Sequence, residues 1–250
     1  PSPFAPSSSS SSSCLSSNVS SQLPITTLEG HMDRVNRLTF HPFIGKGQDF
    51  LYSSSHDLTW RLWDVNKQVE VLQQEGHSRP VFGLAVHPDG SLVCSTGMDT
   101  VSRIWDTRSG RSVMTLKGGH AKEVYACDFH KDGHILATAG ADNQIRVMDL
   151  RKKQCLYFIP AHKHIISRMK FDRGTGHVLT SASFDRTIRL WSVNSGSFSL
   201  VHTLSGHNSP IMGVDISASL DYQNPSSQYL ISSSYDRTWK IWAHSDIKGI

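Results

Sequence analysis

The sequence predicts an all-β protein made of five repeated antiparallel sheets, because three residue types recur in phase along its 250 residues. A histidine after Gly or Ala recurs at steps of 46, 43, 42 and 45 residues: His31, His77, His120, His162 and His207. An aspartate recurs at steps of 42, 43, 43 and 51: Asp57, Asp99, Asp142, Asp185 and Asp236. A strand-ending residue follows with the same steps: Trp63, Trp105, Met148, Trp191 and Trp242. Such a period is typical of sheets repeated radially as the blades of a β-propeller.

The second repeat shows the expected order of elements within each blade. Alternating and β-rich runs predict strands over 81–86, 92–96 and 101–105, and a fourth, outer strand over 112–116. Turn-forming Pro, Asp, Ser and Gly residues separate these runs. The spacing therefore predicts antiparallel four-stranded units.

Three segments of the chain differ in composition. Residues 1–21 contain the unbroken serine run 7–13, three prolines and no charged residue, and we expect residues 1–24 to be disordered. They have neither a basic nor an apolar stretch of the kind found in secretory signals. The five repeats occupy 25–244, and 245–250 form a tail. The first residue is Pro rather than Met, so we expect a fragment or a processed product.

Two repeats are expected to carry long turns. These turns cover 43–49 in the first repeat and 219–228 in the last, and the second one explains the 51-residue step.

The overall composition is that of a mildly basic globular protein. Apolar residues make up 38% and the net charge is +4, which permits an acidic partner but does not require one. No run reaches the roughly 18 apolar residues of a membrane span. The four cysteines lie far apart, so we expect reduced thiols, with no disulfide framework, zinc site or other cofactor.

The recurring residues resemble the WD40 family. The resemblance implies a buried network of the histidine, a Ser or Thr two residues before the Asp, the Asp itself and the Trp. The sets matching this pattern are His31, Ser55, Asp57 and Trp63; His162, Ser183, Asp185 and Trp191; and His207, Ser234, Asp236 and Trp242. The second repeat departs at Gly97, and the third at Gly140 and Met148, so we expect these two blades to be less rigidly tied.

Ser, His and Asp are also the residue types of a hydrolase triad. Here they repeat once per blade and no G-x-S-x-G turn accompanies them. We therefore predict no catalytic residue and no enzymatic activity.

Segments at and around these recurring positions resemble one group of WD40 proteins more closely, the WD40 subunit of the spliceosomal U4/U6 small nuclear ribonucleoprotein. The segments that carry this resemblance are 57–64, 74–78, 122–125, 159–162, 211–217 and 234–238. It implies a nuclear, non-enzymatic scaffold of the U4/U6 and U4/U6·U5 particles in pre-mRNA splicing. Its implied partners are other U4/U6 proteins, including a cyclophilin, and U4/U6 RNA either directly or through proteins. The alternatives are a ubiquitin-ligase substrate receptor and a histone-tail reader.

The number of blades is a second open point. The resembling group has seven blades behind a helical region, so we expect the five repeats to be part of a seven-bladed propeller. The alternative is a closed five-bladed ring in which Thr26–Leu28 supply the outer strand of the fifth blade.

In WD40 proteins, three positions per repeat contact partners on the top face. Carried over by motif, the predicted protein-binding residues are Arg34, Asn36, His56, Phe82, Met98, Tyr125, Ile165, Phe184, Met212 and Tyr235. The same positions also give Pro80, Glu123, Ala141, Ser167 and Pro210. Aromatic side chains and methionines are adhesive at interfaces, which favours a protein or peptide docking face. The alternative is that several of these rings only pack against neighbouring blades.

The turns on the opposite face are rich in basic residues. The predicted contacts for RNA phosphate or an acidic partner are Lys67, Arg108, Arg111, Arg151, Lys152 and Lys153. Ordinary solvated charge is the alternative interpretation.

Overall fold

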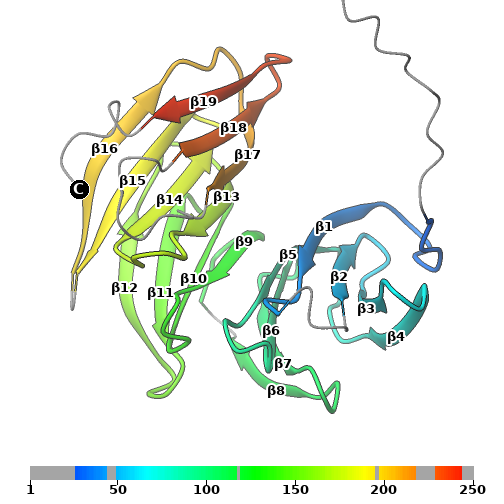
Figure 1. The fold of residues 1–250 in the computed structure, drawn as a ribbon. Helices are drawn as coiled ribbons and strands as arrows, with labels where there is room; N and C mark the ends of the chain where they lie inside the picture. The colour runs from blue at the N-terminus through cyan, green and yellow to red at the C-terminus, as the bar shows by residue number, and fades with distance from the viewer. Residues whose placement is uncertain (1–25, 44–48, 117–118, 195–196, 218–228, 244–250) are drawn as a thin grey trace, which may run out of the picture.

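The computed structural model describes residues 26–43, 49–116, 119–194, 197–217 and 229–243. Within these ranges the chain forms β-strands and no helix, and therefore no helix that could cross a membrane. The strands make five antiparallel sheets that follow one another as blades along an arc (Figure 1). The all-β propeller architecture with five blades is thus confirmed. The expected disordered segment 1–24 and the tail 245–250 lie outside the described residues, as do most of the two long turns.

Each blade is a meander in which consecutive strands pair. Blade 1 contains β1 (Val35–Phe40), β2 (Phe50–Ser55), β3 (Trp60–Asp64) and β4 (Val69–Gln74). Blade 2 contains β5 (Val81–Val86), β6 (Leu92–Gly97), β7 (Ser102–Asp106) and β8 (Ser112–Leu116). Blade 3 contains β9 (Val124–Phe129), β10 (Ile135–Gly140), β11 (Gln144–Asp149) and β12 (Gln154–Pro160). Blade 4 contains β13 (Ile166–Phe171), β14 (Val178–Ser183), β15 (Thr187–Asn194) and β16 (Ser197–Ser205). Blade 5 contains β17 (Ile211–Ile216), β18 (Tyr229–Ser234) and β19 (Trp239–Ala243).

The hydrophobic core is divided among the four junctions between neighbouring blades. Tyr52, Trp60 and Leu62 of blade 1 pack against Leu84 and Trp105 of blade 2. Three further clusters join blades 2 and 3, blades 3 and 4, and blades 4 and 5. Since each blade buries its apolar surface only against its neighbours, the stability of the arc is approximately a sum over these junctions.

Histidines on the turn after the first strand add polar links between blades. His87 Nε2 lies 3.0 Å from the carbonyl oxygen of Gly133, and His130 Nε2 lies 2.9 Å from that of Gly176. Gly133 has a φ of 73°, and a Cβ there would lie 2.2 Å from the His87 ring. Only glycine suits both the turn and this close approach.

The two ends of the arc leave sheet faces uncovered. On blade 5, Ile231 pairs with Ile241, and they share a face with Trp239. The exposed fraction is 44% for Ile231, 54% for Ile241 and 67% for Trp239. On blade 1, Leu38 and Phe40 are likewise exposed on one face of β1. Blades 1 and 5, in blue and in orange to red, stand at opposite ends of the arc (Figure 1).

The alternative of a closed five-bladed ring is not what the structure shows. Within the described residues the fifth sheet has three strands, and Thr26–Leu28 form no strand beside it. Thr26 and Leu28 instead line a cavity of about 410 Å³ with Leu38 and Trp63 of blade 1. The segment therefore packs on the blade that follows it in sequence.

Candidate functional site

A buried polar network fixes one end of each blade. In blade 1, His31 Nδ1 lies 2.7 Å from Asp57 Oδ2, and His31 Nε2 lies 2.7 Å from Ser53 Oγ. The indole N–H of Trp63 donates to the same Ser53 oxygen at 2.7 Å. Since the carboxylate can only accept, His31 carries its proton on Nδ1, and Ser53 donates to Nε2. Histidine, hydroxyl, Asp and Trp thus tie four segments of one blade together.

The hydroxyl in this network is not the one that the sequence predicted. It lies four residues before the Asp, rather than two, in every blade: Ser53, Ser95, Thr138, Ser181 and Ser232. Ser55 instead donates to the carbonyl of Asp33 and accepts the backbone N–H of Asp57. Ser183 and Ser234 play the same role in blades 4 and 5. Both hydroxyls lie on one face of the strand because side chains alternate with period two, so the sequence could not separate them.

This correction changes the expectation for blades 2 and 3. Ser95 lies 2.8 Å from His77 Nε2 and accepts the Trp105 indole N–H at 2.7 Å, so the network of blade 2 is complete despite Gly97. In blade 3, His120 reaches Asp142 and Thr138. The Met148 side chain has no N–H to donate to Thr138, so the indole hydrogen bond is the one link of this network that blade 3 lacks.

The network aspartates are stabilised as carboxylates. Burial raises the pKa of Asp57, but hydrogen bonds from Thr59, His31 and the Met32 backbone outweigh it and lower the pKa to about 2. The pKa values of Asp99, Asp142, Asp185 and Asp236 are lowered as well. The hydroxyls of Ser53, Ser95 and Ser181 are buried among these partners. A substrate cannot reach them, so the sets serve as internal ties rather than as hydrolase triads.

The top-face residues are presented by a β-bulge in the first strand of every blade. Strand pairing skips one residue in β1, β5, β9, β13 and β17. The skipped residues are Asn36, Phe82, Tyr125, Ser167 and Met212. A bulge leaves its extra residue unpaired and re-aims the side chain. All five are among the positions carried over from the WD40 pattern.

One cavity of about 380 Å³ brings residues of all five blades together. Of the ten predicted protein-binding residues, seven line it: Asn36, Phe82, Met98, Tyr125, Ile165, Phe184 and Met212. Ser167 lines it too, as do Val35 and Arg168, which the sequence reasoning missed. The predicted residues Arg34, His56 and Tyr235 are not part of its lining.

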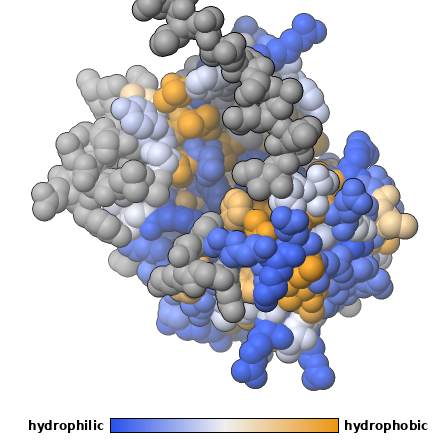
Figure 2. Space-filling view, turned by 45° about the vertical axis from the view of Figure 1, so that its right-hand side comes forward, coloured by the Kyte–Doolittle hydropathy of each residue, from blue (hydrophilic) through white to orange (hydrophobic). Residues whose placement is uncertain are grey.

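The aromatic residues around this cavity contact one another. The ring of Phe82 meets His56 with centroids 5.0 Å apart, and meets Tyr125 edge-on at 5.1 Å. Phe82, Tyr125 and Phe184 nevertheless stay partly exposed. The rings therefore pack on one another across blades and still offer surface to a ligand. Figure 2 shows apolar surface on both sides of a hollow, among hydrophilic residues.

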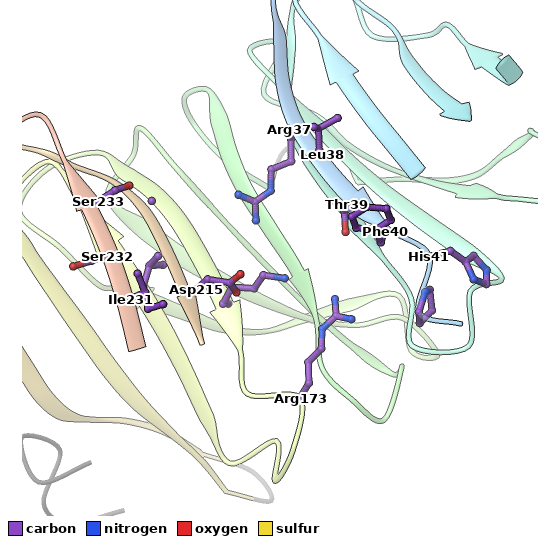
Figure 3. Close-up of a pocket in the computed structure, with 14 residues that line it drawn as sticks. Arg37, Leu38, Thr39, Phe40, His41, Arg173, Asp215, Ile231, Ser232 and Ser233 are labelled. Carbon is purple, nitrogen blue, oxygen red and sulfur yellow. The ribbon is translucent and has the colours of Figure 1, made fainter. Parts of the chain in front are cut away.

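A second cavity, of about 610 Å³, lies between the ends of the arc. Arg37, Leu38 and Phe40 of β1 line one side of it, and Asp215 and Ile231 of blade 5 line the other (Figure 3). This cavity is the opening of the arc itself.

The predicted basic residues all lie exposed in the turns between third and fourth strands of blades 1 to 3. Lys67 Nζ lies 3.2 Å from Asp64 and Arg151 Nη2 lies 3.6 Å from Asp149, so two of the six charges have a local partner. Exposed pairs of this kind are weak and leave the cations available to other anions.

The described cysteines are free: Cys94 and Cys127 are buried, and Cys155 is half-buried. The described residues contain no group of three His, Cys, Asp or Glu side chains that could hold a metal ion.

Fold and site together define a blade-repeat β-propeller with a multi-blade cavity on one face. The chain belongs to the WD40 family (WD domain, G-beta repeat), whose model matches residues 22–64, 67–106, 110–149, 153–192 and 198–243. WD40 propellers generally serve as scaffolds for protein–protein interaction.

Among its relatives, Coronin-7 of Pongo abelii is 41% identical over 88 residues, which are 35% of this chain and 9% of that protein. Nuclear distribution protein PAC1 of Coccidioides posadasii is 31% identical over 229 residues, 87% of this chain and 40% of PAC1. A guanine nucleotide-binding protein subunit beta-like protein of Encephalitozoon cuniculi is 35% identical over 94 residues, 35% of this chain and 28% of that protein. The chain thus matches less than half the length of each of these relatives.

Proposed function

We propose that this chain is a non-enzymatic scaffold that binds a peptide segment of a partner protein in the top-face cavity. The observation that carries the proposal is the cavity itself, which is lined by residues of all five blades and which includes Phe82, Tyr125, Phe184 and two methionines from blades 2 to 5. Its volume of about 380 Å³ suits a few side chains of an extended peptide. Aromatic anchors at the centre of a surface contribute most to binding energy.

Replacing Phe82 and Tyr125 together by Ala is expected to lower partner capture by the tagged full chain at least about 10-fold, since two anchors are lost. The readout is quantitative mass spectrometry of co-purified proteins. Phe158→Ala is the matched control, because Phe158 is an exposed aromatic residue on the outer strand β12. Unchanged capture by a double variant with an unchanged melting temperature would refute the top-face assignment.

We further propose that the assembly it serves is the U4/U6 and U4/U6·U5 small nuclear ribonucleoprotein in the nucleus, with other U4/U6 proteins and a cyclophilin as partners. The support is the resemblance carried by segments 57–64, 74–78, 122–125, 159–162, 211–217 and 234–238. We also propose that the five blades belong to a seven-bladed propeller, which is supported by the uncovered faces of blades 1 and 5.

U4 and U6 RNA are expected to co-purify with the tagged chain from nuclear extract, and the measurement is RNA detection in the purified material. Direct contact through the six basic turn residues would make capture of naked U4/U6 RNA fall steeply with salt. Co-purification of protein partners without either RNA would eliminate the splicing assignment. Ubiquitin-ligase subunits or histones in their place would favour a substrate receptor or a histone reader.

A further inference from the structure

The lining of the top-face cavity includes a positive charge that no carboxylate in the described part of the chain pairs with. Arg168 lies on β13 and lines the cavity among apolar side chains. Its guanidinium donates to two backbone carbonyls, of Ser167 at 3.5 Å and of Asn36 at 3.3 Å. No ion pair joins it to a carboxylate in the described residues. Arg168 is half-buried, and charges that are partly removed from water are normally paired with a counter-ion, which the described residues do not provide.

The surroundings of Arg168 oppose its charge. Burial lowers the pKa of Arg168 to about 10, and repulsion from Arg37 adds to this effect, whereas Cys127 acts in the opposite sense. Arg37 also has no carboxylate partner among the described residues, and its side chain points into the neighbouring cavity (Figure 3). The guanidinium stays charged at neutral pH, and two like charges stand near one another. An anion bound between blades 1 and 4 would stabilise the half-buried guanidinium and offset the repulsion between the two arginines.

Only two of the five blades have an arginine directly after the bulge. The residue directly after the bulge is Arg37, Gly83, Ala126, Arg168 and Gly213 in blades 1 to 5. Three blades therefore place a small residue where two place a guanidinium. Burial and the charge of Glu123 raise the pKa of Tyr125. Glu123 itself does not line the cavity.

The geometry points to a specific ligand chemistry: the top-face cavity takes a peptide that places an Asp or Glu carboxylate on Arg168, next to an apolar side chain held by Phe82, Tyr125 and Phe184. A guanidinium matches a carboxylate with two parallel hydrogen bonds. The apolar lining disfavours a doubly charged phosphate, which loses more hydration on entry. This inference rests on the proposed peptide-docking function and adds the sign of the charge that the peptide carries.

Binding of the full chain to a peptide array tests this carboxylate subsite. The array contains short peptides with one Glu flanked by Leu or Phe, together with matched peptides that carry Gln or phosphoserine in place of Glu. The Glu peptides are expected to bind at least about 10-fold more tightly than their Gln counterparts. Arg168→Gln keeps a donor for the two carbonyls and is expected to abolish this preference. Arg37→Gln, at a side chain without a hydrogen bond in the described residues, is expected to reduce it.

The outcomes separate the inference from the function on which it rests. Equal binding of Glu and Gln peptides, lost in the Phe82→Ala/Tyr125→Ala variant, would overturn the carboxylate subsite and leave the docking function standing. A preference for phosphoserine would also overturn it. A Glu preference that survives Arg168→Gln would show that the charge is read elsewhere. Binding that the double aromatic variant leaves unchanged would refute the docking face as well.

Discussion

Asp185→Ala is expected to lower the free energy of unfolding by about 2 to 3 kcal/mol, because it leaves the buried His162 and the half-buried Thr187 without their acceptor. The Asp185 carboxylate accepts from His162 at 2.9 Å, from the Lys163 backbone at 3.1 Å, and from the N–H and hydroxyl of Thr187 at 3.0 and 2.6 Å. Asp185→Asn retains one acceptor oxygen and is expected to cost less. The measurement is urea denaturation followed by tryptophan fluorescence.

Asp132→Ala is the control for this substitution. Its carboxylate is 60% exposed and lies 3.4 Å from His130, so its loss is expected to cost less than about 0.5 kcal/mol. Equal losses for Asp185→Ala and Asp132→Ala would contradict the role assigned to the network.

The same network predicts how stability depends on pH. Burial raises the pKa of Asp185, but hydrogen bonds from His162, Thr187 and Lys163 outweigh it, so the folded-state pKa is lowered. In the unfolded chain an Asp side chain has a pKa of about 3.9. The stabilisation by Asp185 is therefore fully present above about pH 4 and is lost as the pH falls towards the lower folded-state value. The difference in unfolding free energy between wild type and Asp185→Asn is expected to narrow from pH 6 to pH 3.

The isolated chain is expected to self-associate at micromolar concentration, because both ends of the arc expose apolar sheet faces. Sedimentation velocity should show species heavier than the 27.8 kDa monomer. Replacing Ile231 and Ile241 by Lys puts two charges on the uncovered face of blade 5 and is expected to shift the distribution towards monomer. Val113→Lys, on the outer strand β8, is the control because that valine is exposed away from the two ends.

A monomer that melts cooperatively would contradict this expectation. Such a result would show that the five blades are sufficient by themselves, and it would count against the proposed seven-bladed propeller.

The sequence predicted most residues of the candidate site. The features that it missed depend on how strands pair and on a comparison of the five blades. The repeat placed Phe82, Tyr125 and Met212 at equivalent positions, and the structure brings these positions to one cavity. The sequence could not show that each lies at a bulge, because a bulge depends on how two strands pair. It also offered a signal for Arg168, an arginine where three other blades have Gly or Ala, but only if the five first strands were compared residue by residue.

The sequence by itself determined the all-β class, the five blades and the strand order, because alternation, turn residues and the recurring His, Asp and Trp are local features of each repeat. Only the tertiary structure decided which hydroxyl joins the network, since Ser53 and Ser55 share one face of β2 and differ in what lies opposite. It also decided that Thr26–Leu28 pack on blade 1 and that Arg168 reaches Asn36 across the cavity. The Arg168–Asn36 contact joins segments 132 residues apart, so it depends on the distance between blades 1 and 4, whereas the other two depend on how segments pack within blade 1.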